Sequence, residues 1–145
     1  MGPAVEKDRF VVPENVVVVD SAPHSRVFPL ADLIITHAGH GTVMRALSQG
    51  LPMVCLPMGR DQNDNAIKVQ HHECGLALSA KAKPKKIRNA VHQILADNSF
   101  KGAALSFQKD IRATEESSGG LEIGKLIEPG SEYSIKQVEA SMRYA

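Results

Sequence analysis

The sequence lacks tryptophan, and aromatic residues of all kinds make up only 4% of its 145 residues. Cysteine is also scarce, and the spacing of Cys55 and Cys74 matches no metal or redox motif, so we expect two reduced thiols. The hydrophobic content of 43% is therefore mainly aliphatic. Such a composition is typical of buried parallel strands in a sheet that is covered on both faces.

Long apolar runs and a strong net charge are missing as well. The longest apolar runs, residues 16–19 and 51–58, are far shorter than a membrane span, and the first residues lack the apolar core of a signal peptide. We therefore expect a cytoplasmic protein without a membrane span. The formal net charge of +1 gives no global field that would attract nucleic acid.

Strand and helix signals alternate along a chain that is long enough for one domain. The predicted strands are residues 16–20, 33–36, 53–56 and 76–78. The predicted helical segments are residues 26–30, 41–49, 61–73, 84–96, 100–114 and 121–127. Gly50 and Gly75 are expected to end two of these helices, and Asp61 is expected to cap one. The alternation predicts an α/β fold with a Rossmann-like parallel sheet, flanking helices, and ligands beyond the carboxyl ends of the strands.

Residues 37–42, with the sequence His-Ala-Gly-His-Gly-Thr, lie between a predicted strand and a predicted helix. Gly39 and Gly41 allow the backbone to approach an anion closely, and Thr42 offers a hydroxyl group. The helix that follows directs its free N–H groups toward the same place. The stretch predicts a diphosphate cradle, although a tight connection without a ligand has the same local pattern.

Further short elements follow this stretch in a fixed order: Gly50-Leu-Pro52, an apolar run that ends at Pro57, Asp61-Gln62 and Asn65-Ala66. Together they resemble the nucleotide-sugar signature of two-domain (GT-B) glycosyltransferases of family 1, which include the UDP-glucosyltransferases and the macrolide glycosyltransferases. The bacterial form, His-x-Gly-His-Gly-Thr, is more similar than the plant form, His-Cys-Gly-Trp-Asn-Ser. The resemblance implies a partial C-terminal, donor-binding domain.

The resemblance covers residues 12–127 and implies a lead at 1–11, a donor-binding domain at 12–128 and a tail at 129–145. In this family the histidine that deprotonates the acceptor hydroxyl belongs to the N-terminal acceptor domain, which has no counterpart here. No catalytic residue is therefore assigned to this chain. The resemblance places His24, His37 and His40 on the donor side.

The resemblance assigns the donor diphosphate to His37, Gly39, His40, Gly41 and Thr42, with the His37 ring as a hydrogen-bond donor. No metal or other cofactor is then needed to bind the diphosphate. His37 and His40 also lack a nearby carboxylate or cysteine at a spacing suitable for a metal.

Asp61 and Gln62 resemble the pair that binds the hydroxyls of the donor sugar. A carboxylate and an amide together supply acceptors and donors that distinguish vicinal hydroxyls. A plain helix cap is the alternative role for Asp61, and the two roles are compatible. Asn65 is expected on the helix surface or behind the site.

Ser21, Ala22, Pro23 and His24 align with the nucleoside-binding motif of the plant enzymes, but the tryptophan that stacks on uracil there is absent. Arg45 occupies the place of a ribose-binding glutamate, and an arginine cannot accept a hydrogen bond. A deoxyribose donor thus becomes conceivable. Both a UDP-sugar and a dTDP-sugar remain open as the donor.

Two other features have simpler explanations. A basic cluster is expected to be a solvated edge or a partner contact, and it lacks the interleaved aromatic residues of a nucleic-acid site; it consists of Lys81, Lys83, Lys85, Lys86 and Arg88. His71 and His72 are expected at the end of a helix rather than at a metal, because adjacent helical residues face different directions.

Two functions remain open from the sequence. The first is the donor-binding part of a glycosyltransferase that moves a hexose from a UDP- or dTDP-sugar to a small-molecule hydroxyl, inactive alone. The second is a partner-dependent or non-catalytic nucleotide-sugar-binding subunit that docks on a separate acceptor-domain chain. An incomplete sheet would also favour self-association.

Overall fold

A computed structural model of the chain describes residues 12–19 and 21–117. The elements in chain order are α1 (His24–Val27), η2 (Phe28–Leu30), β1 (Ile34–Thr36), α2 (His40–Ser48), β2 (Met53–Cys55), α3 (Gln62–His71), β3 (Gly75–Ala77), α4 (Pro84–Ala96) and α5 (Asn98–Ser117). The chain divides into two compact units, Met1–Gln108 and Lys109–Ala145, and all the described strands belong to the first.

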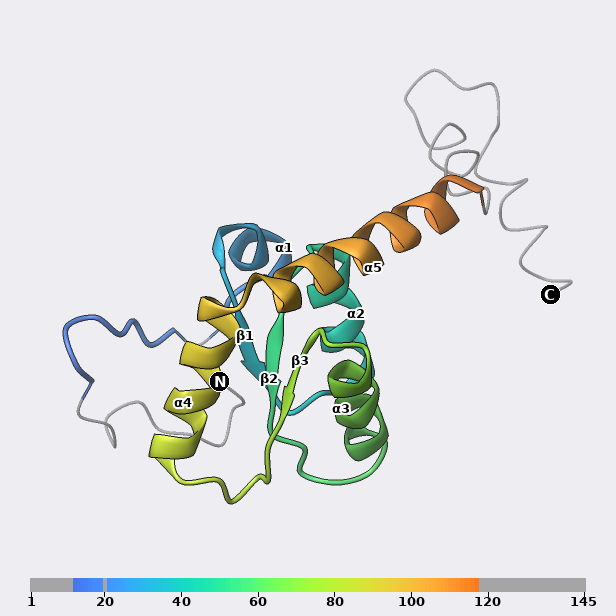
Figure 1. The fold of residues 1–145 in the computed structure, drawn as a ribbon. Coiled ribbons are helices and arrows are strands. Elements are labelled where there is room, and N and C mark those ends of the chain that lie inside the picture. The colour runs from blue at the N-terminus through green and yellow to red at the C-terminus, as the bar shows by residue number, and fades with distance from the viewer. Residues whose placement is uncertain (1–11, 20, 118–145) are drawn as a thin grey trace, which may run out of the picture. The chain divides into compact units, whose positions relative to one another are not determined.

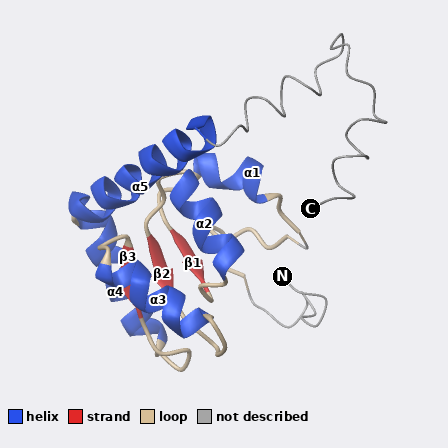
Figure 2. Ribbon diagram, turned by 90° about the vertical axis from the view of Figure 1, so that its right-hand side faces the viewer, coloured by secondary structure: helices blue, strands red, loops and turns tan. Residues whose placement is uncertain are grey.

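The three strands form one parallel sheet in the order β1-β2-β3. Helix α4 packs on one face over β2 and β3, and α2 and α3 lie on the opposite face (Figure 1, Figure 2). The predicted Rossmann-like arrangement, a parallel sheet between flanking helices, is confirmed.

Strand β2 is the centre of the core. Val54 packs on one face against Ala90 and Ile94 of α4 and against Phe100 of α5. Met53 and Cys55, whose side chains point to the other face, are fully buried. Because β2 is covered on both faces, its residues are all apolar instead of alternating with polar ones.

Several predicted boundaries agree closely with the structure. Helix α2 is followed by Gly50, whose φ of 62° is the left-handed conformation that glycine adopts readily. Helix α4 has the predicted bounds and begins at Pro84, where a missing backbone N–H costs nothing. The predicted helical turn at residues 26–30 is confirmed as parts of α1 and η2.

The strand predicted at residues 16–20 is wrong for residues 16–19, which have no regular structure; Asp20 lies outside the described residues. Val17 is 85% exposed, and the N–H of Val16 donates to the carbonyl of Pro13 in a turn (3.0 Å). A strand needs a neighbour that bonds its backbone, and no described strand lies beside this run. The high β-propensity of the four valines at 16–19 is therefore not sufficient to form a strand.

The end of α3 differs from the prediction. The helix ends at His71, and the residue in the left-handed conformation is Glu73, with φ of 56°, rather than Gly75. Gly75 is the first residue of β3, and a Cβ atom there would collide with the carbonyl oxygen of Met53. The close approach of two backbones, and not a helix stop, requires this glycine.

Helix α5 continues beyond its predicted end at residue 114 and reaches Ser117. Glu115 and Glu116 are good helix formers, so the polar segment that they begin does not end the helix at once. The hydroxyl of Thr114 donates to the carbonyl of Asp110 one turn earlier (2.8 Å). The predicted helix at 121–127 and the tail at 129–145 lie outside the described residues.

Both cysteines are free and buried, which confirms the expected unpaired thiols. Burial raises the pKa of the Cys55 thiol to about 12 and that of the Cys74 thiol to about 11, because the interior solvates a thiolate poorly. Both thiols are therefore protonated at neutral pH and act as small apolar core residues.

Replacing Gly75 with alanine tests the close approach of β2 and β3. The added methyl group would meet the Met53 backbone, which cannot rotate away, so we expect the free energy of unfolding to fall by about 3 kcal/mol. Gly102→Ala in α5 is the matched control, because no atom lies within 4 Å of its new Cβ. The control should raise the stability by up to about 1 kcal/mol. Urea denaturation measures both variants, and equal losses would contradict the role of Gly75.

Candidate functional site

The carboxyl ends of the three strands lie at one edge of the sheet because all three run in parallel. Three segments leave this edge: residues 37–39 lead into α2, residues 56–61 lead into α3, and residues 78–83 lead into α4 (Figure 1). The residues predicted for the diphosphate and for the sugar therefore come from neighbouring segments.

The turn after β1 has a strained conformation that two hydrogen bonds hold in place. Ala38 is fully buried and has φ of 64°, which costs an L-residue about 1–2 kcal/mol. Its N–H donates to the hydroxyl oxygen of Thr36 (3.2 Å). Its carbonyl accepts the side-chain amide of Asn65 on α3 (3.0 Å). The second bond fastens the turn to the start of the next helix.

The turn leaves the first backbone donors of α2 free. Gly39 is the N-cap residue, and its carbonyl accepts the N–H groups of Thr42 (3.0 Å) and Val43 (3.1 Å). The N–H groups of Gly39, His40 and Gly41 have no hydrogen-bond acceptor among the described residues. Free donors at the positive end of a helix dipole favour an anion.

The side chain of His37 lies over Gly39. A Cβ atom at position 39 would come within 2.7 Å of Nε2 of His37, so only glycine leaves room for the ring in this position. His37 as a whole is exposed. The structure thus holds an accessible imidazole beside the free N–H groups of Gly39, His40 and Gly41.

His37 and Thr42 line an open hollow of about 730 Å³ beside β1, and His24, Phe28 and Met58 also line it. The rings of His24 and Phe28 stack with their centroids 4.5 Å apart. Nδ1 of His24 is buried and has no hydrogen-bond partner within the described structure. One predicted nucleoside residue therefore shares a hollow with two predicted diphosphate residues.

A second hollow, of about 520 Å³, shares the ring stack with the first. Pro23 and His24 line it together with Arg45, which contributes from α2. Of the four residues predicted for the nucleoside, Pro23 and His24 thus line this pair of hollows. Ser21 and Ala22 are exposed and line neither.

Asp61 and Gln62 stand at the start of α3. The amide oxygen of Gln62 accepts the N–H of Met58 (2.8 Å), and the amide nitrogen has no hydrogen-bond acceptor among the described residues. Asp61 is the N-cap residue, as predicted, but its side chain makes no capping hydrogen bond. Its Oδ2 instead accepts the side-chain amide of Asn65 (3.2 Å), so the carboxylate is oriented but exposed.

Asn65 makes contacts that its sequence pattern alone did not indicate. Its amide bonds both to the turn after β1 and to Asp61, and it thereby joins the two predicted halves of the site. Asn65 is half-buried between these two segments. The i, i+4 spacing between Asp61 and Asn65 was the available signal. Phe28 was missed because nothing in the sequence indicates that it stacks on His24.

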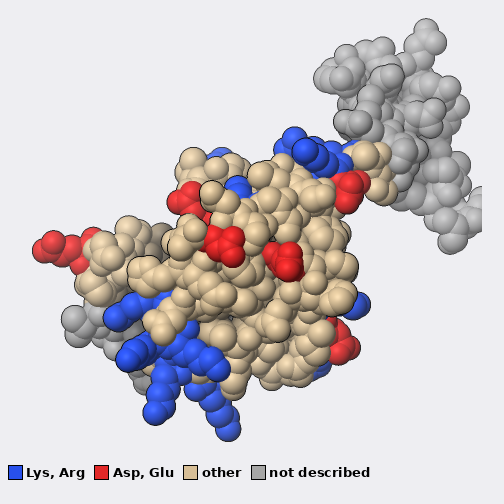
Figure 3. All heavy atoms as spheres, in the orientation of Figure 1, with Lys and Arg blue, Asp and Glu red and all other residues tan. Residues whose placement is uncertain are grey.

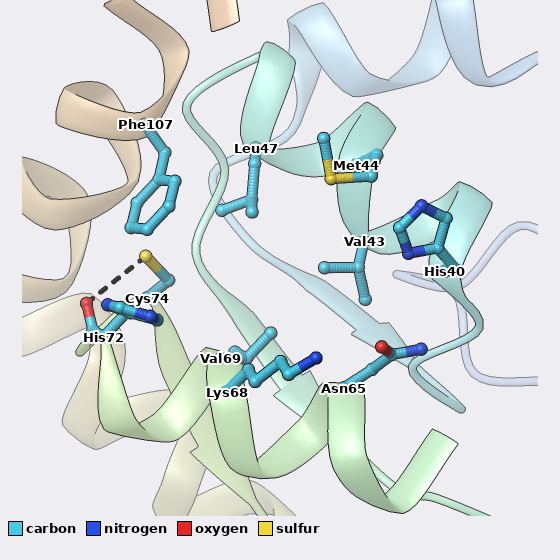
Figure 4. Close-up of a pocket in the computed structure, with 10 residues that line it drawn as sticks. All are labelled: His40, Val43, Met44, Leu47, Asn65, Lys68, Val69, His72, Cys74 and Phe107. Carbon is cyan, nitrogen blue, oxygen red and sulfur yellow. Dashed lines mark hydrogen bonds between the residues drawn. The ribbon is translucent and has the colours of Figure 1, made fainter. Parts of the chain in front are cut away.

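The side chain of His40 lies in a different hollow from that of His37. Figure 4 shows a mostly apolar hollow of about 210 Å³ that is lined from α2, α3, the segment between α3 and β3, and α5. In it, Sγ of Cys74 donates to the carbonyl of His72 (3.4 Å). Its lining residues are His40, Val43, Met44, Leu47, Asn65, Lys68, Val69, His72, Cys74 and Phe107. The backbone N–H, rather than the ring, is the group of His40 that lies with the predicted diphosphate donors.

Within the described residues, no group of three or more His, Cys, Asp or Glu side chains is placed to hold a metal ion. His71 and His72 lie ring edge to ring face, with centroids 5.2 Å apart, and His72 meets Phe107 in the same way. None of the helices in this part of the chain has the length and apolar character needed to cross a bilayer.

The chain has relatives among known glycosyltransferases. It is 34% identical over 99 residues to a sterol 3-beta-glucosyltransferase of Vanderwaltozyma polyspora, covering 68% of this chain and 8% of that protein. It is 31% identical over 102 residues to the human UDP-glucuronosyltransferase 3A2, covering 68% of this chain and 20% of that protein. The chain therefore spans at most about a fifth of these two relatives.

Solved structures have the same fold. The glycosyltransferase VinC in complex with dTDP superposes with a TM-score of 0.69 at 28% identity, covering 77% of this chain and 29% of that one. The glycotransferase of kitacinnamycin superposes with a TM-score of 0.66 at 30% identity, covering 70% and 26%. The sheet and its helices are those of the C-terminal domain of a GT-B glycosyltransferase. Residues 4–119 match the family described as "Erythromycin biosynthesis protein CIII-like, C-terminal domain", and the chain belongs to this family.

Replacing Asn65 with alanine tests the link between the turn and α3. The change removes hydrogen bonds to a buried carbonyl and to Asp61, so we expect the free energy of unfolding to fall by about 1–2 kcal/mol. Asn63→Ala, on the exposed side of the same helix, is the control and should change stability by less than about 0.5 kcal/mol. Thermal and urea melts compare them, and an Asn65 variant as stable as the control would refute the link.

Proposed function

We propose that the chain is the donor-binding part of a glycosyltransferase that transfers a hexose from a UDP- or dTDP-sugar to a small-molecule hydroxyl acceptor. The observation that carries the proposal is the position of His37 over Gly39, beside three backbone N–H groups without acceptors. The imidazole and the helix start donate hydrogen bonds to the diphosphate, and they stabilise the charge that develops on it as the sugar leaves.

Gly39, Gly41 and Thr42 let the backbone and a hydroxyl group approach the phosphates, and His40 contributes its N–H. Asp61 and Gln62 bind the sugar hydroxyls, with the Gln62 amide nitrogen as a donor and the Asp61 carboxylate as an acceptor. The free ends of both side chains support this assignment. Neither a metal nor another cofactor is part of the proposal.

The nucleoside occupies the hollows on the His24–Phe28 stack, where Pro23 and Arg45 complete the lining. The orphaned Nδ1 of His24 supports a polar ligand there, because a buried polar atom without a partner is costly. Arg45 cannot accept a bond from a ribose hydroxyl, which favours dTDP. VinC was solved with dTDP, whereas UDP-glucuronosyltransferases are named for UDP, so both nucleotides belong in the test.

The alternative is a nucleotide-sugar-binding subunit that depends on a partner, and the edge of β1 favours it. The N–H of Ile34 donates to Pro52, and the carbonyl of Thr36 accepts the N–H of Leu56, so both residues direct their backbone toward β2. Ile35 between them directs its backbone away, and it is 52% exposed. A further strand, from another segment or a separate acceptor-domain chain, would cover this edge, as would self-association.

Isothermal titration of the full chain with UDP and with dTDP tests the proposal. We expect one or both to bind, and we expect His37→Ala to weaken binding at least tenfold, because it removes a hydrogen bond to a charged phosphate. His92→Ala on α4 is the control and should bind like the wild type, since His92 is exposed and lines neither hollow. A wild-type chain that binds neither nucleotide would overturn the donor-site proposal.

A second pair of variants in the same titration tests whether nucleotide binding depends on the position of the His37 ring rather than on the stability of the fold. Gly39→Ala pushes the His37 ring aside and should weaken binding without unfolding the chain, because a side-chain end can move. Gly102→Ala in α5 is the control: its new Cβ meets no atom within 4 Å and Gly102 lines neither hollow, so this variant should bind nucleotide like the wild type. If Gly39→Ala binds nucleotide as tightly as the wild type, His37 does not act from its observed position.

A further inference from the structure

Five cations gather at one corner of the molecule, at the start of α4 and in the loop before it (Figure 3). We call this cluster the basic corner; it consists of Lys81, Lys83, Lys85, Lys86 and Arg88, and all five are exposed. No aspartate or glutamate occurs between Cys74 and Ala96. Since the whole chain has a net charge of only +1, the rest of the chain is net negative, and the positive charge is concentrated at this corner.

The basic corner does not stabilise the helix on which it lies. Helix α4 has Lys83 as its N-cap residue, has no side-chain cap and has no acidic residue in its first turn. Cations at this end oppose the helix dipole, and each costs a few tenths of a kcal/mol. None of the five has a carboxylate partner among the described residues. A cluster that opposes local stability in this way indicates a role in binding.

The chemistry of the corner favours a flat anionic surface. Four of its five cations are lysines, which act as flexible point charges rather than as bidentate forks. They project from a convex corner in Figure 3 and line none of the three hollows described above. No Phe, Tyr or Trp occurs in residues 74–96 to stack on a base, which disfavours single-stranded nucleic acid.

The basic corner also lies near the carboxyl ends of the strands, where the candidate site is. The loop of residues 78–83 leaves the carboxyl end of β3, and the turn with His37 leaves the carboxyl end of β1, two strands away. A ligand bound at the basic corner would therefore lie at the same end of the sheet as the candidate donor site.

We propose that the basic corner binds the surface of a bilayer that contains anionic phospholipid, and that it thereby turns the strand-end edge toward the membrane. The attraction is electrostatic, about fivefold in affinity for each lysine near the surface. It decays within a Debye length and is thus strongly salt dependent. The proposal does not depend on the donor-site proposal, because nucleotide need not be bound.

Vesicle flotation of the full chain tests this proposal with vesicles of phosphatidylcholine alone and vesicles that also contain phosphatidylserine. We expect binding only to the second kind at low salt and release at high salt. Lys85→Gln/Lys86→Gln should bind about thirtyfold more weakly. The double variant should melt at the same or a higher temperature than the wild type, because it removes charges that oppose the α4 dipole.

Lys109→Gln/Arg112→Gln is the matched control. It removes the same net charge from exposed positions on α5 and should bind vesicles like the wild type. Equal losses in the two double variants would refute a localised site, and so would the absence of binding to phosphatidylserine vesicles at low salt. The proposal would also fail if duplex DNA or an acidic polypeptide bound through Lys85 and Lys86 while vesicles did not.

Discussion

One hydrogen bond, from the side-chain amide of Asn65 to the carbonyl of Ala38, determines the geometry of the candidate site. It joins two segments that are 27 residues apart and holds a buried alanine in a left-handed conformation that it would not otherwise favour. The same amide orients Asp61. With the turn fixed, His37 lies over Gly39 and the first N–H groups of α2 remain free for an anion.

The sheet supplies the rest of the arrangement. Parallel strands bring every strand-to-helix segment to one end of the sheet, so the residues proposed for the diphosphate and those proposed for the sugar become neighbours. The buried strand β2 gives both segments a rigid base. The outer edge of β1, beside the hollow that His37 and Thr42 line, has no strand paired with it in the described structure. The candidate donor site and the uncovered edge of β1 are thus parts of one surface, which is why a partner and a ligand are linked in the proposed function.

The bounds of helices could be predicted from the sequence where residues within the helix itself determine them. Pro84 and the helical spacing of apolar residues gave α4 its bounds, and Gly50 gave the end of α2. The valine run at 16–19 misled because a strand depends on a neighbour, and Gly75 misled because its reason is the Met53 backbone across the sheet. For the candidate site, spacing and resemblance predicted His37 and Gln62, but neither could show that the side chains of His37 and His40 line different hollows. That separation follows from tertiary packing alone.

The most direct measurement of the central claim is an amide chemical-shift titration of the isotope-labelled full chain with dTDP and with UDP. The account predicts that the backbone signals of Gly39, His40 and Gly41 shift together on addition of nucleotide, because their free N–H groups receive the phosphate oxygens. If a nucleotide binds while these three signals stay in place, or if neither nucleotide shifts them, the turn after β1 is not the diphosphate site.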